Sequence, residues 1–535
     1  MTDQLVTAPV LVALVSIVLT LSLRRWPRLQ RAASVAGGVG YAVAVALVAW
    51  GVVLAPNAPG AVAYQIGGWP APFGITLVAD ALSAFMLVVA ASVGLPAVVL
   101  SVLFIDVDNQ RVFYHPLFHS LLLGIAGAFL TGDLFNLFVW FEVMLMASYV
   151  LVAFYSGAQH TAAAFRYLVL NVIGGVFLLL AVGGLYATTG TLNMADMAQR
   201  LADPGAYGID PAPVFGLSAL LFAAFALKAG LVPFQFWVPG AYRAAPLPVS
   251  AMLAGASKKV GIYAIIRLYF TVFSGTSASA SVPWIADGSP LSVLAPGLLI
   301  MGVASVLVGA LGAVSRDTIE GMLAYSSIGQ VGFIAVPVAI AAGAGSEELR
   351  HLGIVAALVY ALHHALAKGL LFFSAAAVRS ATGTNRMAEL SGLASRSPAL
   401  AGAFFIGSLS LVGVPPLTGF FGKFLVFATA ADGYAADPAV GSGAVLLVLL
   451  LGALLTILYT TRAWVGSFWG PRTPSVEAAT VDRGQVAVLV AVAAAIILLG
   501  IGFDPVYRFA SAAADAAVDT NGYVDVVDPA GGDGS

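Results

Sequence analysis

The sequence predicts an all-α integral membrane protein with about fourteen transmembrane helices. Hydrophobic residues make up 60% of the 535 residues and charged ones only 9%, with a mean hydropathy of +0.99. Soluble domains carry roughly 25% charged residues. Apolar runs long enough to cross a bilayer as helices, about 20 residues each, also recur along almost the whole chain. A soluble multidomain protein is therefore excluded.

Composition also excludes several classes of function. Cysteine is absent, so the chain can form neither a disulfide framework nor a thiolate metal site. The formal net charge of −2 indicates no nucleic acid partner. We expect no cofactor and no resident metal, because the sequence has no Gly-rich phosphate loop, no metal-ligand spacing and no nucleophile beside a base. No Lys or Arg precedes the first apolar run, so no cleavable signal is predicted.

The predicted spans follow one another with short connections. They lie near residues 7–23, 33–54, 78–104, 113–131, 133–156, 163–187, 213–239, 246–272, 290–313, 319–341, 352–378, 398–430, 443–467 and 484–503. We divide the chain into an N-terminal three-helix segment (1–110), a first repeat (111–272), a second repeat (290–470), a C-terminal helix (471–510) and a disordered acidic tail (511–535). The tail is expected to be disordered because it is rich in Asp and Gly.

Arginine determines the predicted orientation. Alternate loops on one side hold most of the arginines: Arg24, Arg25, Arg28, Arg31, Arg111, Arg166, Arg243, Arg316, Arg379, Arg386, Arg396, Arg472 and Arg483. The opposite side holds Arg200, Arg350 and Arg508, with Arg267 near it at a span end. By the positive-inside rule the arginine-rich side is cytoplasmic, which places both termini outside, as an even number of spans requires. On the outer side, residues 55–76 predict a hairpin and residues 189–212 a short interfacial helix.

The five lysines, in contrast, all lie within predicted spans. They are Lys228, Lys258, Lys259, Lys368 and Lys423. A charge at the centre of a bilayer costs from about 3 to well over about 10 kcal/mol, so such a residue needs a partner or a function. A buried lysine can release its proton, whereas arginine effectively cannot. Lysines at mid-membrane depth therefore indicate a proton path.

Two of these lysines lie beside proline interruptions. Lys228 is the single charge in PVFGLSALLFAAFALKAGLVPFQFWVPGAY and precedes Pro233, and Lys423 follows Pro415 and Pro416 in SLSLVGVPPLTGFFGKFLVF. Proline lacks an N–H donor and strains the preceding turn, so both spans are predicted to break. Interrupted segments five spans apart indicate two inverted repeats, because an odd number of spans inverts the topology. Proline alone is common in membrane helices, and it is the accompanying lysines that favour the repeat.

Other titratable residues lie at similar depth. Glu142 is the only glutamate deep in an apolar span, about 13 Å along the helix from Asp133 at its outer end. His364 and Lys368 are four residues apart and share one helix face, while His363 points about a third of a turn away. A polar packing contact is the plain alternative for the histidine–lysine pair, and a structural ion pair is the alternative for Glu142. Because such groups recur on several spans, we favour a hydrated line through the midplane.

Five segments carry a family resemblance. They are DLFNLFVWFEVMLMASYVL, ALKAGLVPFQFWVPGAYRAAPLPVSAMLAGASKKVGIYAIIR, MLAYSSIGQVG, HHALAKGLLFF and GVPPLTGFFGKFLVF. The segments resemble the proton-translocating antiporter-like subunits shared by complex I, membrane hydrogenases and Mrp-type multisubunit cation/proton antiporters. The resemblance covers residues 75–470, and FNLFVWFEVMLMASYVL and VPFQFWVPGAY are most similar to the D-type subunits of Mrp-type multisubunit Na+/H+ antiporters. It implies fourteen helices with two inverted five-helix repeats, each with a broken helix.

The resemblance also implies roles for the buried charges. The implied proton pathway consists of Glu142, Lys228, Lys259, His364, Lys368 and Lys423. Glu142 would pair with Lys228 in the first half of the protein, and Lys423 would be the terminal site of the second half.

In the centre, Lys259 would link the two halves, and His364 would act as a relay together with Lys368. The central lysine and histidine are both doubled, so Lys258 and His363 remain alternates. The chain also departs from the resembled pattern before LAYSS, where it has Glu320 and Gly321 instead of basic residues. The cytoplasmic end of that span is therefore less positive than expected.

Together with these residues, the resemblance implies a proton-translocating subunit of a monovalent cation (Na+)/proton antiporter, a secondary transporter and not an enzyme, in the plasma membrane. Its partners would be the other antiporter subunits, of the Mrp A, B, C, E, F and G types, together with protons, Na+ and the lipid bilayer. The alternative is a proton-pumping membrane subunit of a redox-driven complex of the complex I or hydrogenase type. Neighbouring genes discriminate between the two: small antiporter subunits favour the first, and flavin or iron–sulfur subunits favour the second.

Overall fold

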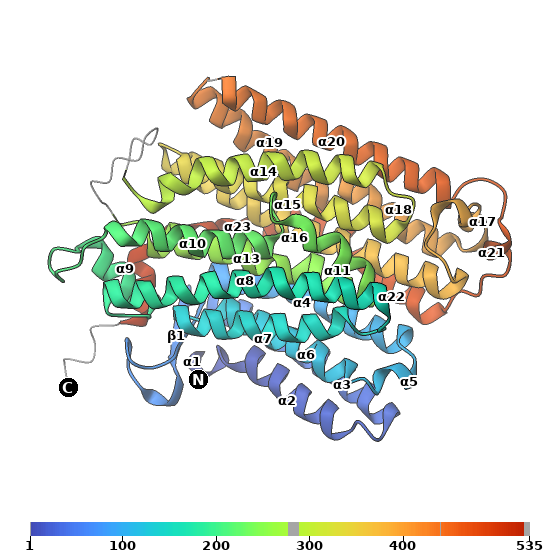
Figure 1. The fold of residues 1–535 in the computed structure, drawn as a ribbon, viewed down its shortest axis with the longest axis horizontal. Helices are drawn as coiled ribbons and strands as arrows, with labels where there is room; N and C mark the ends of the chain where they lie inside the picture. Colours follow the sequence, from blue (N-terminus) through green and yellow to red (C-terminus); the bar gives the residue numbers. More distant parts are fainter. Residues whose placement is uncertain (1, 277–287, 439, 529–535) are drawn as a thin grey trace.

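The computed structural model describes residues 2–276, 288–438 and 440–528, which are mostly helical. Long helices run along the longest axis of the molecule (Figure 1). Among these residues, eleven helical stretches are long and apolar enough to cross a membrane: α3 (Pro27–Ala49) with its π-helical end, α4 (Ala81–Phe104), α7 (Leu134–Val152), α8 (Ala158–Thr189), α10 (Ala212–Ala229), the stretch Leu247–Val272, α14 (Pro290–Val314), α15 (Ile319–Gly343), α16 (Glu347–Thr382), α20 (Val440–Ser467) and α22 (Arg483–Ile501). Three shorter apolar helices are α2 (Ala8–Ser22), α6 (Tyr114–Leu130) and α18 (Pro398–Val412). The predicted multi-pass helical architecture is confirmed.

The predicted extramembrane elements are also present. Strands β1 (Ala61–Gln65) and β2 (Thr76–Asp80) pair antiparallel, with Ala61 opposite Asp80, so the predicted hairpin is confirmed. The predicted short helix is α9 (Met194–Ala202), and it begins where the side chain of Asn193 accepts hydrogen bonds from the next turn. The terminal helices α1 (Thr2–Leu5) and α24 (Thr520–Val527) both contact β1. Both ends of the described chain therefore lie at the same end of the bundle.

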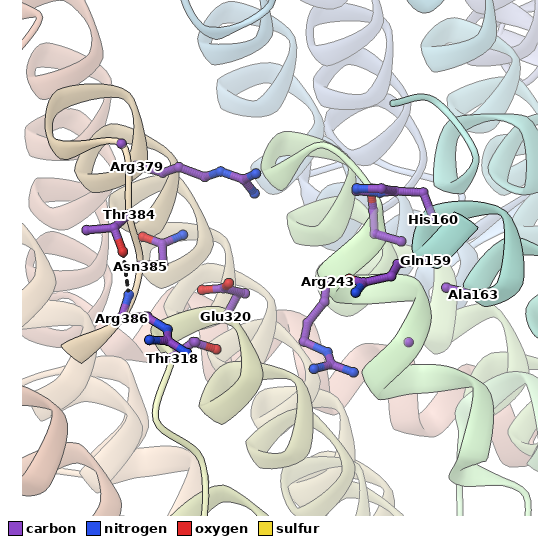
Figure 2. Close-up of a pocket in the computed structure, with 13 residues that line it drawn as sticks. Gln159, His160, Ala163, Arg243, Thr318, Glu320, Arg379, Thr384, Asn385 and Arg386 are labelled. Carbon is purple, nitrogen blue, oxygen red and sulfur yellow. Dashed lines mark hydrogen bonds between the residues drawn. The ribbon is translucent and has the colours of Figure 1, made fainter. Parts of the chain in front are cut away.

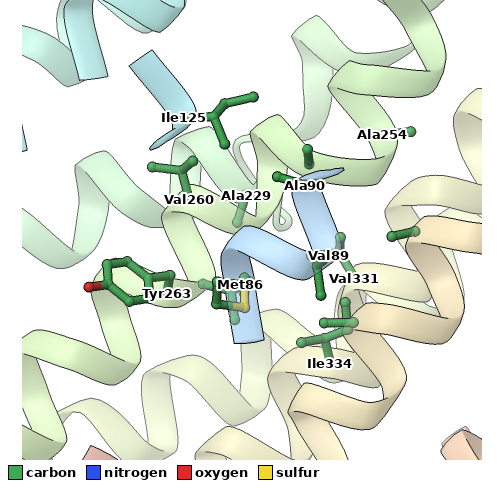
Figure 3. Packing of buried hydrophobic residues seen from close by; sticks show 14 of the residues in the cluster. Met86, Val89, Ala90, Ile125, Ala229, Ala254, Val260, Tyr263, Val331 and Ile334 are labelled. Carbon is green, nitrogen blue, oxygen red and sulfur yellow. The ribbon is translucent and has the colours of Figure 1, made fainter. Parts of the chain in front are cut away.

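Two stretches form the centre of the molecule. The stretch Leu247–Val272 is buried throughout, as is α16 from Gly353 to Val378. A helix that is apolar and buried all round is a core helix. Figure 3 shows the packing at this centre, where side chains meet from α4, α6, α10, α15 and the helix α13 (Lys258–Ile266). Lys258, Lys259, Lys368 and the two histidines of α16 thus lie on the innermost helices.

Both proline-containing spans break, as the sequence predicts. Helix α10 ends at Gly230, and the chain re-forms a helix at α11 (Val238–Ala244). Helix α18 ends at Gly413, and α19 (Thr418–Ala436) follows. Each terminal glycine adopts positive φ, 69° and 95°, and each helix ends with a bond from the following residue to a carbonyl five residues earlier. The two breaks therefore share one local design, the glycine-terminated helix end known as the Schellman motif.

The prediction of a disordered tail from Ser511 is wrong for residues 511–528. Helix α23 (Phe503–Val518) continues through this segment, and α24 follows it. Alanines and Phe509 recur at helical spacing on one face of α23, which packs against α4 and α16, while Asp504 and Asp515 lie on the exposed face. The high Asp content of this segment led to the prediction of disorder, although its apolar residues have the spacing of an amphipathic helix. Residues 529–535 of the predicted tail lie outside the described residues.

Candidate functional site

Lys228 lies in the last turn of α10, directly before the first break, and its side chain is fully buried. Its Nζ donates a hydrogen bond to Tyr167 Oη on α8, at 3.2 Å. The ammonium also lies 5.7 to 5.8 Å from the ring centres of Phe141, Tyr167 and Trp237. Aromatic faces attract a cation, most strongly where water is excluded. Lys228 is therefore held in an aromatic cage with one hydroxyl partner.

Glu142 lies on the neighbouring helix α7 and is only half-buried. Gly175 on α8 provides room for it, since a Cβ there would lie 2.6 Å from Glu142 Oε1. Within the part of the chain that the structure describes, neither a hydrogen bond nor an ion pair joins Glu142 to Lys228. Tyr167, which is also 2.8 Å from Ser148 Oγ on α7, is the group that Lys228 contacts instead.

The first break brings a second lysine close to Lys228. Trp237 Nε1 donates to the carbonyl of Leu227 at 2.9 Å and so satisfies the backbone at the end of α10. Gly230 has no side chain, and a Cβ there would lie 3.1 Å from Lys258 Nζ. Glycine is thus required at this position both for its positive φ and for the approach of Lys258.

The doubled lysines point to different partners. A π-helical turn (Leu253–Ser257) precedes them, and such turns are frequent at functional sites. Lys258 donates to the carbonyl of Ser327 on α15, at 3.3 Å. Lys259 donates to the carbonyl of Ala254 at 2.7 Å, and its Nζ lies 2.5 Å from His364 Nδ1 on α16. Lys258 therefore lies beside the first break and Lys259 contacts the central histidine.

The doubled histidines also diverge. His364 contacts Lys259, whereas His363 Nδ1 lies 3.3 Å from Ser410 Oγ and 3.4 Å from Thr418 Oγ1. Ser410 and Thr418 lie on either side of the second break, on α18 and α19. His364 therefore connects α16 to the first half of the molecule and His363 connects it to the second.

Lys368 lies one turn beyond His364 on α16 and is fully buried. Its Nζ donates to the carbonyl of Leu323 on α15, at 3.0 Å. It contacts neither histidine through a hydrogen bond among the described residues, so its observed partner is the backbone of α15.

Lys423 closes the series at the second break. It lies on α19, and its Nζ donates to the carbonyl of Val412 at 2.8 Å, in the last turn of α18. The ring of Phe333 lies 5.6 Å from this ammonium. The two breaks thus differ in the side chain that donates to the last turn of the helix before the break. Trp237 donates to a carbonyl there at the first break, and Lys423 does so at the second.

A group of neutral residues beside Lys423 was not predicted. Tyr360 on α16 donates to Gln330 Oε1, and Gln330 Nε2 donates to Tyr459 Oη at 3.3 Å. The ring of Tyr360 stacks on Phe333 at 5.5 Å and meets His363 edge-on at 5.4 Å. The only sequence signal for this group is the presence of polar side chains within apolar spans. Such side chains also form ordinary contacts between membrane helices, so they do not single out these residues.

Comparison with known proteins places these residues in a family. The family model described as "NADH:quinone oxidoreductase/Mrp antiporter, TM" matches residues 131–447. The D subunit of the Na(+)/H(+) antiporter of Alkalihalophilus pseudofirmus is 33% identical over 467 residues, 86% of this chain and 87% of that protein. The protein of the same name from Bacillus subtilis is 31% identical over 530 residues, 98% of this chain and 99% of that protein. In the solved Mrp complex from Dietzia sp. DQ12-45-1b, one chain is similar with a TM-score of 0.82 and 28% identity, covering 98% of this chain and 99% of that one.

The matched segment contains both breaks, all five lysines, Glu142 and both central histidines. The chain belongs to the family of membrane subunits that NADH:quinone oxidoreductases and Mrp antiporters have in common.

Proposed function

We propose that the chain is the proton-translocating subunit of a multisubunit Na+/proton antiporter. The names of the two curated relatives and the likeness to a chain of an Mrp complex support an antiporter subunit that works in a hetero-oligomeric membrane complex. The same relatives favour a transporter subunit over a catalytic enzyme. The description of the matched family also includes the redox-driven alternative, which neighbouring genes for flavin or iron–sulfur subunits would favour.

One observation supports the proton path above all others. Buried titratable side chains recur between the two breaks: Lys228 at the first break, then Lys258, the Lys259–His364 contact, and His363 and Lys423 at the second break. Each lysine is fully or almost fully buried, and its hydrogen-bond partners among the described residues are all neutral. Since an ammonium in this setting has no carboxylate to hold its proton, each lysine can serve as a carrier.

Glu142 and Lys228 would form the switch at one end of the line. A carboxylate beside an ammonium stabilises the charged form, and separation of the two in a dry interior removes that stabilisation. The observed contact with Tyr167 corresponds to the separated arrangement, in which the proton of Lys228 is free to move toward Lys258. Return of Lys228 to Glu142 would reload it.

We further propose fourteen spans in two inverted five-helix repeats. The α10/α11 and α18/α19 breaks, with their matched glycine-terminated helix ends, support the repeat. The contacts of α1 and α24 with the same strand fit an even number of spans. An experimental structure of the complex, in which the two repeats superpose after inversion, is the direct test.

The plasma membrane is the proposed location, with both termini outside. The concentration of arginines in one set of loops supports this orientation. We expect a tag at either terminus to be accessible from outside intact cells. Protection of both tags in intact cells, with exposure only after permeabilisation, would reverse the orientation.

Glu142→Ala is expected to abolish cation-dependent proton exchange while the complex still assembles, because the variant loses the one carboxylate that acts on Lys228 among the described residues. Glu142→Gln, which keeps the shape without the charge, should behave in the same way. The measurement is cation-dependent pH change in everted vesicles from antiporter-deficient cells that express the whole gene cluster. Full exchange in Glu142→Ala at normal protein levels would remove Glu142 from the mechanism.

A further inference from the structure

A cavity of about 400 Å³ lies at the arginine-rich end of the molecule, between α8, α11, α15 and the end of α16. Figure 2 shows Glu320 near its centre, with Arg379 and Asn385 on one side and Arg243 and His160 on the other. We propose that this cavity is the cytoplasmic proton entrance of the buried line and that Glu320 is its proton-loading carboxylate. This inference rests on the function proposed above.

Glu320 is neither the cap of its helix nor a member of an ion pair among the described residues. It lies in the first turn of α15, but the cap of this helix is Thr318, whose Oγ1 accepts from the backbone N–H of Gly321 at 3.2 Å. Glu320 forms no ion pair within the described residues, and the nearby Arg386 pairs with the exposed Glu389 instead. Its Oε2 atom is buried without a hydrogen-bond partner there. A buried carboxylate oxygen without a partner requires a functional or hydration explanation.

Glu320 lies on the same helix, α15, as the two carbonyls that accept hydrogen bonds from Lys368 and Lys258. The Leu323 carbonyl, three residues and about 4.5 Å further along the helix axis, accepts from Lys368. The Ser327 carbonyl, seven residues and about 10 Å from Glu320, accepts from Lys258. Residues spaced by three and four share one face of a helix. One face of α15 therefore carries the carboxylate at the cavity and the contacts of two buried lysines behind it.

The transfer is a simple proton exchange. Hydronium in the cavity protonates the Glu320 carboxylate and leaves water. The resulting carboxyl group then supplies a proton, through intervening water, to the neutral amine of Lys368. The carboxyl O–H bond breaks, an N–H bond forms on Lys368, and an ammonium and a carboxylate remain. A further hydronium in the cavity reprotonates the carboxylate and again leaves water.

The charged groups around Glu320 allow its side chain to be either a carboxylate or a protonated carboxyl group. Arg243 from α11 and Arg379 from α16 face it, and the first turn of α15 also favours a negative charge. Burial of the Oε2 atom without a hydrogen-bond partner disfavours the charged carboxylate. Two further titratable groups line the cavity, Arg386 and His160 on α8. Arg386 pairs with Glu389, and His160 is bound through Nδ1 to the carbonyl of Ala244 at 3.0 Å.

The first test replaces Glu320. In everted vesicles, where the cytoplasmic face is outward, Glu320→Gln should lower the exchange rate roughly a hundredfold, as loss of a positioned proton donor does, whereas Glu320→Asp should keep part of it. Glu389→Gln, at an exposed glutamate of the same end, is the matched control and should exchange as wild type. Wild-type exchange in Glu320→Gln at equal levels of assembled complex would overturn the entrance.

The second test uses the absence of natural cysteine in this chain. Ala163→Cys places a thiol in the cavity wall, and Ala388→Cys places one in a separate cavity at the same end. Exchange is measured before and after a membrane-impermeant thiol reagent in the same vesicles. We expect the reagent to lower exchange roughly tenfold or more in Ala163→Cys, because it blocks the supply of the proton donor, and to leave Ala388→Cys unchanged.

The outcomes separate the two levels of the proposal. Wild-type vesicles that show no cation-dependent exchange would overturn the proposed function and the entrance with it. Wild-type exchange together with a labelled but fully active Ala163→Cys would overturn the entrance alone.

Discussion

Lys259→Arg is expected to abolish proton exchange while the complex assembles normally. Lys259 Nζ lies 2.5 Å from His364 Nδ1, and this contact links the first half of the line to α16. Arginine keeps the positive charge and can donate to the same carbonyl and imidazole, but it does not release its proton at any usable pH. We expect a loss of at least about a hundredfold, the order of magnitude that a positioned proton donor contributes.

A control on the same stretch of helix tests whether charge alone matters. Arg267 lies two turns beyond Lys259 and forms a buried ion pair with Asp80, at 2.6 Å. Its charge has a structural role, so Arg267→Lys should lower stability but keep exchange. Both variants are compared by co-purification of the partner subunits and by exchange in everted vesicles. Wild-type exchange in Lys259→Arg would show that Lys259 is a fixed charge.

Lys423→Arg is expected to have an equally large effect at the other end of the line. Lys423 Nζ donates to the carbonyl of Val412 at 2.8 Å and lies over Phe333, and it is the last buried lysine of the series. A structural cation would tolerate arginine, which can donate to the same carbonyl. A proton carrier would not, because arginine stays charged.

Lys423→Glu separates these two roles further. Glutamate loses the positive charge but can still bind and release a proton. If Lys423 is a structural cation, this change should abolish exchange, whereas a proton carrier should keep some exchange with a different pH optimum. Exchange in Lys423→Glu that exceeds exchange in Lys423→Arg is the result we expect.

Hydropathy predicted the course of the chain well, because each predicted span coincides with a helix or with a pair of helices around a break. The ends of the helices were less predictable. Helix α16 begins at Glu347 and α8 at Ala158, both five residues before the predicted spans, because polar residues continue a helix that hydropathy no longer detects. Hydropathy also failed to detect α23, because its apolar face is formed mainly by small alanines between acidic residues.

The charged members of the candidate site could be named from the sequence because a lysine in an apolar run has no other plain explanation. Their partners could not be. Tyr167 takes the contact that the resemblance assigned to Glu142, and Ser410 takes part in the contacts of His363 at the second break. These contacts depend on helix rotation and on the glycines that allow close approach, neither of which the spacing of residues along one helix determines. The divergence of each doubled lysine and histidine likewise became apparent only in three dimensions.

The central claim is that the buried lysines carry protons and do not serve as fixed charges. The most direct measurement is exchange against pH in everted vesicles for wild type, Lys228→Arg, Lys259→Arg and Lys423→Arg at equal levels of assembled complex. We expect all three arginine variants to assemble and to fail to exchange at every pH, since each retains its charge and loses only its ability to release a proton. Exchange at the wild-type level in all three would contradict the central claim.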